Sequence, residues 1–228
     1  MSDPLTNSPL PSPYYQQLLQ NEENNDNSLI DLNGWSVVES WKNENFQMNE
    51  HQTGYLTNMY ASEILSHLYL GSRMAASDKA WLSDHKITHI LTIAGDIPPY
   101  FPESYAYKVI HVNDYEYVNI MEHFDNTYKF IQQALEENGN ILVHCQAGIS
   151  RSPSVLIAYI MRSRQISFDK AFEFVKKQRP VICPNQGFRN QLRLYESMRY
   201  QITKASPKYW GYLAKRWSRT ILHAKIKA

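Results

Sequence analysis

Cysteine is scarce in this chain, which has only Cys145 and Cys183 among its 228 residues. Two cysteines do not make the dense disulfide framework of small secreted domains. Long apolar runs are also missing, and none approaches the roughly 20 residues that a membrane-spanning helix needs. The first residues, Met1 to Pro4, lack the basic and apolar regions of a secretory signal. These absences argue against a secreted or membrane-spanning protein.

Net charge is almost absent as well, because 23 basic and 22 acidic residues leave a formal charge of +1. Such a balance gives no indication of a nucleic-acid partner. The charges are nevertheless spread unevenly. Residues 1–55 contain eight acids and one base, whereas residues 197–228 contain eight bases and no acid. We expect the two ends either to attract each other or to serve different partners.

Composition divides the chain into three parts. Residues 1–55 are rich in Asn, Ser, Pro and acids and have few apolar anchors, so we expect an acidic, disordered extension. Residues 56–204 alternate strand-like and helix-like segments and are expected to form the folded domain. Residues 205–228 form a basic tail, in which Trp210, Leu213, Ala214, Trp217 and Ile221 would share one face of a helix.

Short apolar and β-branched runs predict strands in the folded domain, with a turn at Gly71. These strands cover residues 63–65, 68–72, 87–93, 107–112 and 141–143. Apolar periodicity and flanking Gly or Pro predict helices at residues 75–84, 121–135, from 152, at 168–177 and at 186–200. The alternation predicts an α/β fold with a central, mostly parallel sheet flanked by helices. Such sheets bind ligands at the carboxyl ends of their strands.

The stretch 141–153 is the one around which the rest is organised. It reads as a buried strand, a tight loop, and a helix that opens at Ser152-Pro153, where proline suits the first turn. A loop that enters a helix N-terminus aims several backbone N–H groups at one point, and a tetrahedral phosphate dianion fits there. We call residues 145–151 the phosphate cradle.

Three residues of the phosphate cradle suit phosphate chemistry. Gly148 allows backbone angles that a side chain would forbid. Arg151 can fork onto two phosphoryl oxygens at once. Cys145 would lie at the base of the loop, where the field that binds phosphate also favours a thiolate nucleophile.

The pattern His144-Cys145-x-x-Gly148-x-x-Arg151-Ser152 resembles the signature loop of cysteine-dependent protein phosphatases. The longer sequence from this pattern through residues 158–161 is similar to that of the dual-specificity branch, which removes phosphate from Tyr and from Ser/Thr. Residues 68–72, 87–91 and 184–192 also resemble that family's catalytic domain, so the match covers roughly residues 58–200. Because the residues before the match look unstructured, the resemblance is to atypical members without an N-terminal regulatory domain.

The resemblance implies a role for each site residue. Phosphoryl oxygens would be held by Arg151 and by the backbone of Gln146, Ala147, Gly148, Ile149 and Ser150. Asp114, which lies 31 residues before Cys145 and just after a strand, stands at the position of the family's general acid, with Glu116 as the second candidate. Ser152 would donate a hydrogen bond to the departing thiolate, or it would be only a helix cap.

The expected function is hydrolysis of phosphotyrosine and phosphoserine or phosphothreonine in proteins, through a phosphocysteine intermediate. One alternative is a non-protein substrate, such as a phosphoinositide, an RNA 5′-phosphate or a phosphoglycan. Another is a phosphate-binding adaptor without turnover. The uncharged side chains of the phosphate cradle before Arg151 argue against a highly phosphorylated lipid, and the combination of Cys145, Asp114 and Arg151 argues against a dead enzyme.

The remaining expectations concern partners and surroundings. A thiolate enzyme needs a reducing compartment, so cytoplasm or nucleus is expected. No cofactor and no metal are implied, since the histidines show no metal-ligand spacing. Cys183 is either a small buried residue or a resolving thiol for oxidised Cys145. The tail would bind an anionic membrane, an acidic partner or its own domain. The sequence makes no prediction of oligomeric state.

Overall fold

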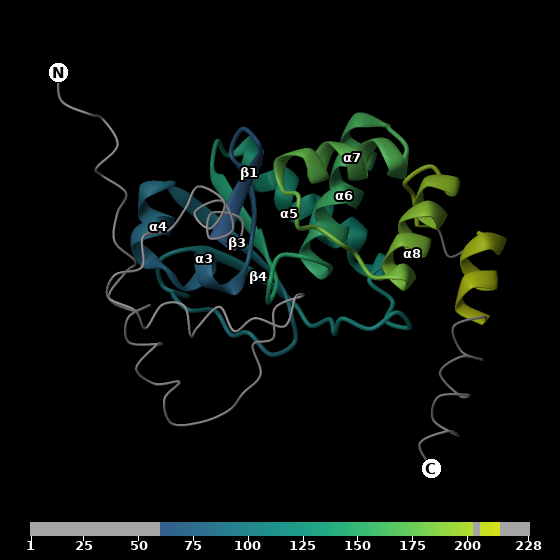
Figure 1. Cartoon of the computed structure of the whole chain (residues 1–228), viewed down its shortest axis with the longest axis horizontal. Helices are drawn as coiled ribbons and strands as arrows, with labels where there is room; N and C mark the ends of the chain where they lie inside the picture. The colour runs from purple at the N-terminus through teal and green to yellow at the C-terminus, as the bar shows by residue number, and fades with distance from the viewer. Residues whose placement is uncertain (1–59, 203–205, 215–228) are drawn as a thin grey trace, which may run out of the picture. The chain divides into compact units, whose positions relative to one another are not determined.

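The computed structural model of the protein describes residues 60–202 and 206–214 (Figure 1). Both ranges belong to one compact unit. The disorder predicted for residues 1–55 lies outside the described residues.

A five-stranded sheet forms the centre of the fold. Its strands are β1 (Ala61–Leu65), β2 (Leu68–Gly71), β3 (Ile87–Ile93), β4 (Ala106–Ile110) and β5 (Asn140–His144), in the order β1-β2-β5-β3-β4. β1 pairs antiparallel with β2, and every other pair is parallel. The predicted α/β fold with a mostly parallel sheet is therefore confirmed.

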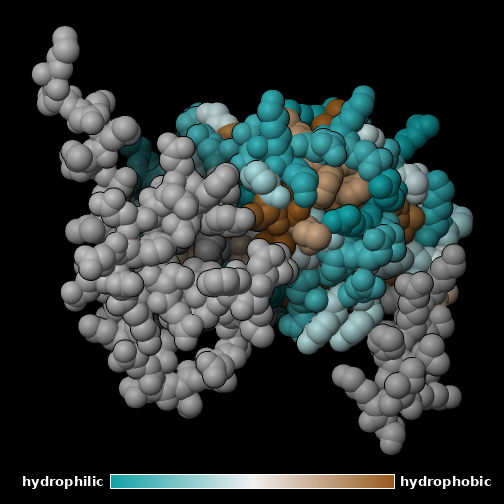
Figure 2. Space-filling model, viewed as in Figure 1, coloured by the Kyte–Doolittle hydropathy of each residue, from teal (hydrophilic) through white to brown (hydrophobic). Residues whose placement is uncertain are grey.

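Both faces of the sheet are covered by helices. The short helices α3 (Arg73–Ser77) and α4 (Lys79–Asp84) pack on one face in the smaller core cluster. The larger cluster lies on the other face and contains α5 (Phe124–Glu136), α6 (Arg151–Arg164), α7 (Phe168–Gln178) and α8 (Gln186–Ser197) (Figure 1). In the view of Figure 2 the described surface is mostly hydrophilic, with hydrophobic residues only in small areas.

The central strand β5 shows why the chain folds in this way. Ile141, Leu142 and Val143 have no exposed surface. Because neighbouring side chains on a strand point to opposite faces, Ile141 and Val143 join the larger cluster and Leu142 joins the smaller one. Helix α6 follows with ten consecutive buried residues, Ser152–Met161, because α5, α7 and α8 all pack against it. The phosphate cradle thus connects a central, buried strand to a mostly buried helix.

Several predicted elements differ from the structure at their ends. The single helix predicted at 75–84 is two helices, because Asp78 has an extended backbone (φ −94°, ψ 98°) and its carboxylate caps α4 by accepting from the Trp81 N–H at 3.0 Å. Gly71, where the sequence predicts a turn, is the last residue of β2. Helix α8 ends at Ser197 rather than near 200, since Arg199 and Tyr200 have positive φ angles of 53° and 58°.

Part of the basic tail packs on the folded domain. Residues 207–214 are helical, and Tyr209 and Tyr212 contact the larger core cluster. Lys208 Nζ donates to the carbonyl of Ser197 at the end of α8, at 3.0 Å. Trp210, on the expected apolar face, is 56% exposed, while Leu213 is half-buried. Residues 215–228 lie outside the described part, in which no helix is long and apolar enough to cross a membrane.

Candidate active site

Cys145 lies at the base of the phosphate cradle, immediately after β5, and is 2% exposed. Two hydrogen-bond donors point at its sulfur: the Ser152 hydroxyl at 3.2 Å and the Gly148 N–H at 3.3 Å. Donors of this kind stabilise negative charge on sulfur. Ser152 comes from the first turn of α6, which also directs the positive end of the helix dipole toward the cradle. The structure therefore brings Ser152 to the place where a departing thiolate would need it.

The backbone of the phosphate cradle is held from outside through its carbonyl groups. Every carbonyl from residue 145 to residue 149 accepts a hydrogen bond from a donor in another part of the chain or from the preceding histidine. The donors are His144 Nδ1 on Cys145 (3.3 Å), the Arg73 N–H on Gln146 (3.0 Å), Arg179 Nη2 on Ala147 (3.3 Å), Arg179 Nε on Gly148 (3.1 Å) and the Cys183 N–H on Ile149 (2.7 Å).

This pattern fixes the direction of the amide groups. In a planar trans peptide the carbonyl and the following N–H point in opposite directions. The carbonyls are directed outward, so the N–H groups of residues 146–150 are directed into the cradle. The contact of the Gly148 N–H with the Cys145 sulfur shows this inward direction at one position. That these N–H groups converge on a phosphate above the thiol stays a prediction.

Gly148 is the tightest point of the phosphate cradle. Its φ angle is +69°, in the left-handed region that favours glycine. A Cβ at this position would also lie 2.6 Å from the Gly71 carbonyl oxygen and 2.8 Å from Arg179 Nη2. The loop therefore packs directly on the end of β2 and on a buried arginine.

Arg179 is a site residue that the sequence reasoning missed. The residue is completely buried. Burial lowers the pKa of its guanidinium to about 10, which leaves the group charged at neutral pH. Its position four residues after Val175 continues the buried stripe of α7, which is the signal that would have placed it inside. Arg179 holds two cradle carbonyls and adds positive charge beneath Cys145.

His144 acts on the cradle without facing the thiol. It is 1% exposed, and burial lowers its pKa to about 4, so the ring is neutral. Because the Cys145 carbonyl can only accept, Nδ1 carries the proton, and Nε2 accepts from the Thr92 hydroxyl at 2.8 Å. His144 therefore ties the carbonyl of the nucleophile's own residue to β3.

Asp114 overhangs the phosphate cradle from the acid loop, by which we mean residues 111–120 between β4 and the 3₁₀ turn Met121–His123. Its Oδ1 accepts from the Ser150 hydroxyl at 2.7 Å and from Asn185 Nδ2 at 2.8 Å. Its Oδ2 lies 3.5 Å from Arg151 Nε. A carboxyl group at the mouth of the cradle is suitably placed for proton transfer to a bound ester oxygen.

Arg151 opens α6 and keeps part of its donor capacity unused. Its Nη1 donates to the Val112 carbonyl at 3.3 Å. Its Nε is buried and makes no hydrogen bond within the described residues, because the 3.5 Å contact with Asp114 has ion-pair distance but not hydrogen-bond geometry. A buried donor without a partner is costly, and a phosphoryl oxygen would satisfy it.

Helix α8 positions the acid loop. Asn185 caps the helix by accepting from the Phe188 N–H at 2.9 Å while its amide donates to Asp114. Gln191 donates to the Val118 carbonyl at 2.8 Å and accepts from the Met121 N–H at 3.0 Å. Gly187 allows the loop to approach, since a Cβ there would overlap the Glu116 carbonyl.

Glu116, the second candidate acid, does not reach the cradle in this arrangement. Its backbone lies against Gly187, and within residues 60–202 its exposed carboxylate makes no hydrogen bond or ion pair with Cys145, Ser150 or Arg151. Of the two carboxylates, the structure brings Asp114 to the site.

Cys183 lies close behind the cradle but is not buried. Both cysteines are free; Cys183 is exposed, and its sulfur accepts from Arg189 Nη2 at 3.3 Å. Its backbone N–H is the donor that holds the Ile149 carbonyl. The expectation that Cys183 is a small buried residue is therefore wrong, and its role as a resolving thiol stays a prediction.

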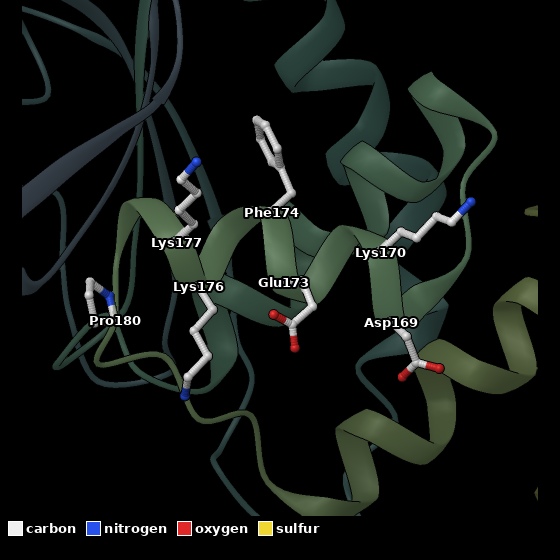
Figure 3. Close-up of a pocket in the computed structure, with 7 residues that line it drawn as sticks. All are labelled: Asp169, Lys170, Glu173, Phe174, Lys176, Lys177 and Pro180. Atoms are coloured by element: carbon white, nitrogen blue, oxygen red, sulfur yellow. The ribbon is translucent and has the colours of Figure 1, made fainter.

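A separate surface hollow lies along α7 and does not belong to this site (Figure 3). Its side chains project from both sides of the helix, and they are Asp169, Lys170, Glu173, Phe174, Lys176, Lys177 and Pro180. The Phe174 ring is covered by the Arg164 guanidinium, 4.5 Å from its centre. None of the catalytic candidates lines this hollow. In the described part of the chain, no group of three or more His, Cys, Asp or Glu side chains is placed to hold a metal ion.

Comparison with known proteins identifies the family. Residues 68–198, more than half of the chain, match the family model described as "Dual specificity phosphatase, catalytic domain". Dual specificity protein phosphatase 19 of Mus musculus is 36% identical over 175 residues, which cover 72% of this chain and 80% of that protein. MAP kinase phosphatase with leucine-rich repeats protein 2 of Dictyostelium discoideum is 43% identical over 133 residues, 58% of this chain but 19% of its own length.

A solved structure has a similar fold. The human tyrosine phosphatase-like serine/threonine/tyrosine-interacting protein shares 37% sequence identity and a TM-score of 0.59, and the match covers 63% of this chain and 99% of that chain. The sequence match and the shared fold agree with the geometry of Cys145, Asp114 and Arg151. This chain belongs to the dual specificity phosphatase family.

Proposed function

We propose that this chain is a protein phosphatase that hydrolyses phosphotyrosine and phosphoserine or phosphothreonine through a phosphocysteine intermediate. The observation that carries the proposal is the thiol of Cys145 beneath inward-directed amides, with Asp114 held over the same point by Ser150. Membership of the dual specificity phosphatase family supports it.

The first chemical step breaks the ester. The Cys145 thiolate attacks phosphorus, a phosphorus–sulfur bond forms, and the phosphorus–oxygen bond to the substrate breaks. Asp114 gives its proton to the leaving oxygen, which departs as the alcohol or phenol. Arg151 turns from Asp114 to the phosphoryl oxygens, so that its unpartnered Nε is satisfied.

The second step regenerates the enzyme. Asp114, now a carboxylate, takes a proton from water while the water oxygen attacks phosphorus and the phosphorus–sulfur bond breaks. The thiolate leaves with the Ser152 hydroxyl and the Gly148 N–H directed at its sulfur. Inorganic phosphate is released, and the protonation state of each group is restored by solvent.

Non-protein phosphate esters are the second candidate class of substrate. Between Cys145 and Arg151 the phosphate cradle carries no charged side chain, so it offers a single guanidinium rather than the several cations that a multiply phosphorylated headgroup would need. This favours a singly phosphorylated side chain over a phosphoinositide.

A binding protein without turnover is the other alternative, and one similar structure is described as phosphatase-like and interacting. In this chain the nucleophile, its two hydrogen-bond donors and the overhanging carboxylate are all present together. Such a set is needed for turnover and not for binding alone.

We further propose that the protein works in the cytoplasm or nucleus, where a thiolate stays reduced. The basic tail is proposed to contact an anionic membrane or an acidic partner through residues beyond Ala214. Deleting residues 215–228 should then reduce co-sedimentation with anionic vesicles without lowering the melting temperature. Unchanged co-sedimentation would exclude the membrane.

The test of the proposed activity uses a chromogenic aryl phosphate, a phosphotyrosine peptide, a phosphoserine peptide and a phosphoinositide. The wild-type chain should hydrolyse the first three, and vanadate should inhibit. Cys145→Ser should bind vanadate but lose turnover, because a hydroxyl is a far weaker nucleophile than a thiolate. Cys183→Ser is the matched control and should keep turnover. If the wild type shows no turnover of any of these substrates, the chain is a phosphate-binding protein rather than an enzyme.

A further inference from the structure

The acid loop carries an exposed pair of aromatic rings. Tyr115 and Tyr117 are 54% and 39% exposed, and Trp210 is the third exposed large hydrophobic side chain among the described residues. The two tyrosine rings are stacked, with centroids 5.3 Å apart and planes 6° from parallel. Tyr115 follows Asp114 directly in the chain, and Tyr117 follows two residues later. An exposed aromatic pair of this kind is a candidate contact surface.

The pair lies at the edge of the catalytic site. Asp114 contacts both Ser150 and Arg151, and the Cα atom of Tyr115 is about 3.8 Å from that of Asp114 because the two are neighbours in the chain. A peptide whose phosphorylated side chain enters the phosphate cradle can therefore place a flanking residue against these rings.

The loop that carries the rings is already fixed before a substrate binds. Asn185 donates a hydrogen bond to Asp114. The Glu116 backbone packs against Gly187. Gln191 forms hydrogen bonds with Val118 and Met121. A contact surface that is ordered in advance costs less conformational entropy on binding. The rings can thus favour one kind of flanking residue over another.

Glu116 lies between the two tyrosines in the chain, and its exposed carboxylate has no ion pair within the described residues. A positively charged side chain of a substrate is therefore favoured at the acid loop.

We propose that Tyr115, Glu116 and Tyr117 bind a positively charged side chain of the substrate, with arginine preferred, next to the phosphorylated residue. The proposal rests on the protein-phosphatase function proposed above. The face of a tyrosine ring attracts a cation. Arginine adds a planar group that stacks on the ring and donors that reach a carboxylate, whereas an apolar side chain gains only buried area.

The experiment compares peptides that differ only beside the phosphotyrosine. One arginine is placed at each of the three positions on either side, and matched peptides carry alanine, leucine or glutamate there. At one or more positions arginine should raise kcat/KM over alanine by about two- to fivefold, the range for a cation–ring contact at an exposed site. The gain should lie in KM and shrink with added salt.

Four variants locate the effect. Tyr115→Leu/Tyr117→Leu removes the ring faces and should abolish the arginine preference, and Glu116→Gln should reduce it. Tyr115→Phe/Tyr117→Phe keeps the rings and should retain the preference. Trp210→Leu removes an equally exposed ring elsewhere and is the matched control. All four should keep the kcat of the wild type on a small chromogenic phosphate ester.

Three results would overturn the proposal: no position at which arginine is favoured, an equal gain with leucine, or a preference that survives in the Leu/Leu variant. Loss of the preference in the Phe/Phe variant would also count against it, because the hydroxyl groups would then carry the contact. Failure of the wild type to hydrolyse the chromogenic ester would instead overturn the proposed function, so the two failures are distinguishable.

Discussion

The phosphate cradle and the acid loop contribute to one site, but they are built differently. The cradle is mostly buried or half-buried, and its form is set by backbone carbonyls that accept from His144, Arg73, Arg179 and Cys183. The acid loop is exposed over residues 113–117, and three positions at the start of α8 hold it. Changes to the cradle should therefore damage phosphate binding, whereas changes at Asp114 or at the α8 residues that hold it should damage proton transfer and leave phosphate binding intact.

The largest effect expected from the acid loop is that of Asp114→Asn. Without the proton donor, kcat/KM for substrates with poor leaving groups should fall by roughly 10²–10⁴, because this constant reports the first step. Aryl esters whose leaving group is a weak base need little protonation, so their kcat/KM should be nearly that of the wild type, while that of phosphoserine should not. The measurement is kcat/KM across a series of phosphate esters, with vanadate binding as the control that should not change.

An equal loss for every leaving group in Asp114→Asn would mean that Asp114 is structural. Glu116→Gln is the companion variant and should keep the leaving-group dependence of the wild type. If it abolishes that dependence instead, the assignment of the acid is wrong.

Arg179→Met tests the cradle. The change leaves the Ala147 and Gly148 carbonyls without their donor, and the loop should shift. A displacement of about 1 Å at a reacting group costs about 10² in rate, so kcat/KM should fall by at least this factor. The loss should be the same for all leaving groups and should be accompanied by weaker vanadate binding.

Arg189→Met is the matched control for Arg179, because this arginine lies on the neighbouring helix α8 and contacts Pro184 and Cys183 rather than the cradle carbonyls. It should keep vanadate binding. Normal vanadate binding in Arg179→Met would contradict the role given to the buried guanidinium.

The case of Arg179 shows what could be predicted from the sequence and what could not. The segment from β5 through the cradle to α6 is local, so strand pattern, glycine and proline together were sufficient to predict it. Three of the donors that shape it come from residues 73, 179 and 183, far away in the sequence, and no local pattern says which carbonyl a distant donor will reach. The break between α3 and α4 at Asp78 was not predicted for a different reason. An aspartate is compatible both with a helix cap and with an exposed position inside a helix.

Gln191→Ala should have a smaller effect on the acid loop. It removes the bonds to Val118 and Met121 but leaves Asn185 on Asp114. We expect kcat to fall by about tenfold, less than for a full misplacement of the acid, and mostly for poor leaving groups. Gln186→Ala, at an exposed position of the same helix, should have no effect on kcat. A uniform loss across leaving groups would mean that Gln191 acts only on stability.

The smallest effect concerns stability and pH. Burial holds the pKa of His144 at about 4, below the usual 6.5, so above pH 6.5 the ring is neutral in both the folded and the unfolded chain. As the pH falls from 6.5 toward 4, the unfolded chain takes up a proton that the folded chain refuses. The free energy of unfolding should decrease over this window by roughly 3 kcal/mol from this group.

Denaturant midpoints at pH 7 and pH 5 measure the part of that decrease that falls above pH 5, about 2 kcal/mol. His144→Gln should flatten the pH dependence, and His111→Gln, a change at an exposed histidine, should not. An unchanged pH slope in His144→Gln would show that other groups dominate the acid sensitivity.

The central claim is that phosphate passes through Cys145 and that Asp114 serves both steps. The most direct measurement is rapid quenching of Asp114→Asn with an aryl phosphate of good leaving group, followed by mass spectrometry of the peptides that contain Cys145 and Cys183. The first step should proceed while the second, which needs the carboxylate as base, is slow. The account predicts that a phosphoryl group accumulates on Cys145 and not on Cys183. Turnover without phosphoryl on Cys145, or wild-type turnover in Cys145→Ser, would contradict it.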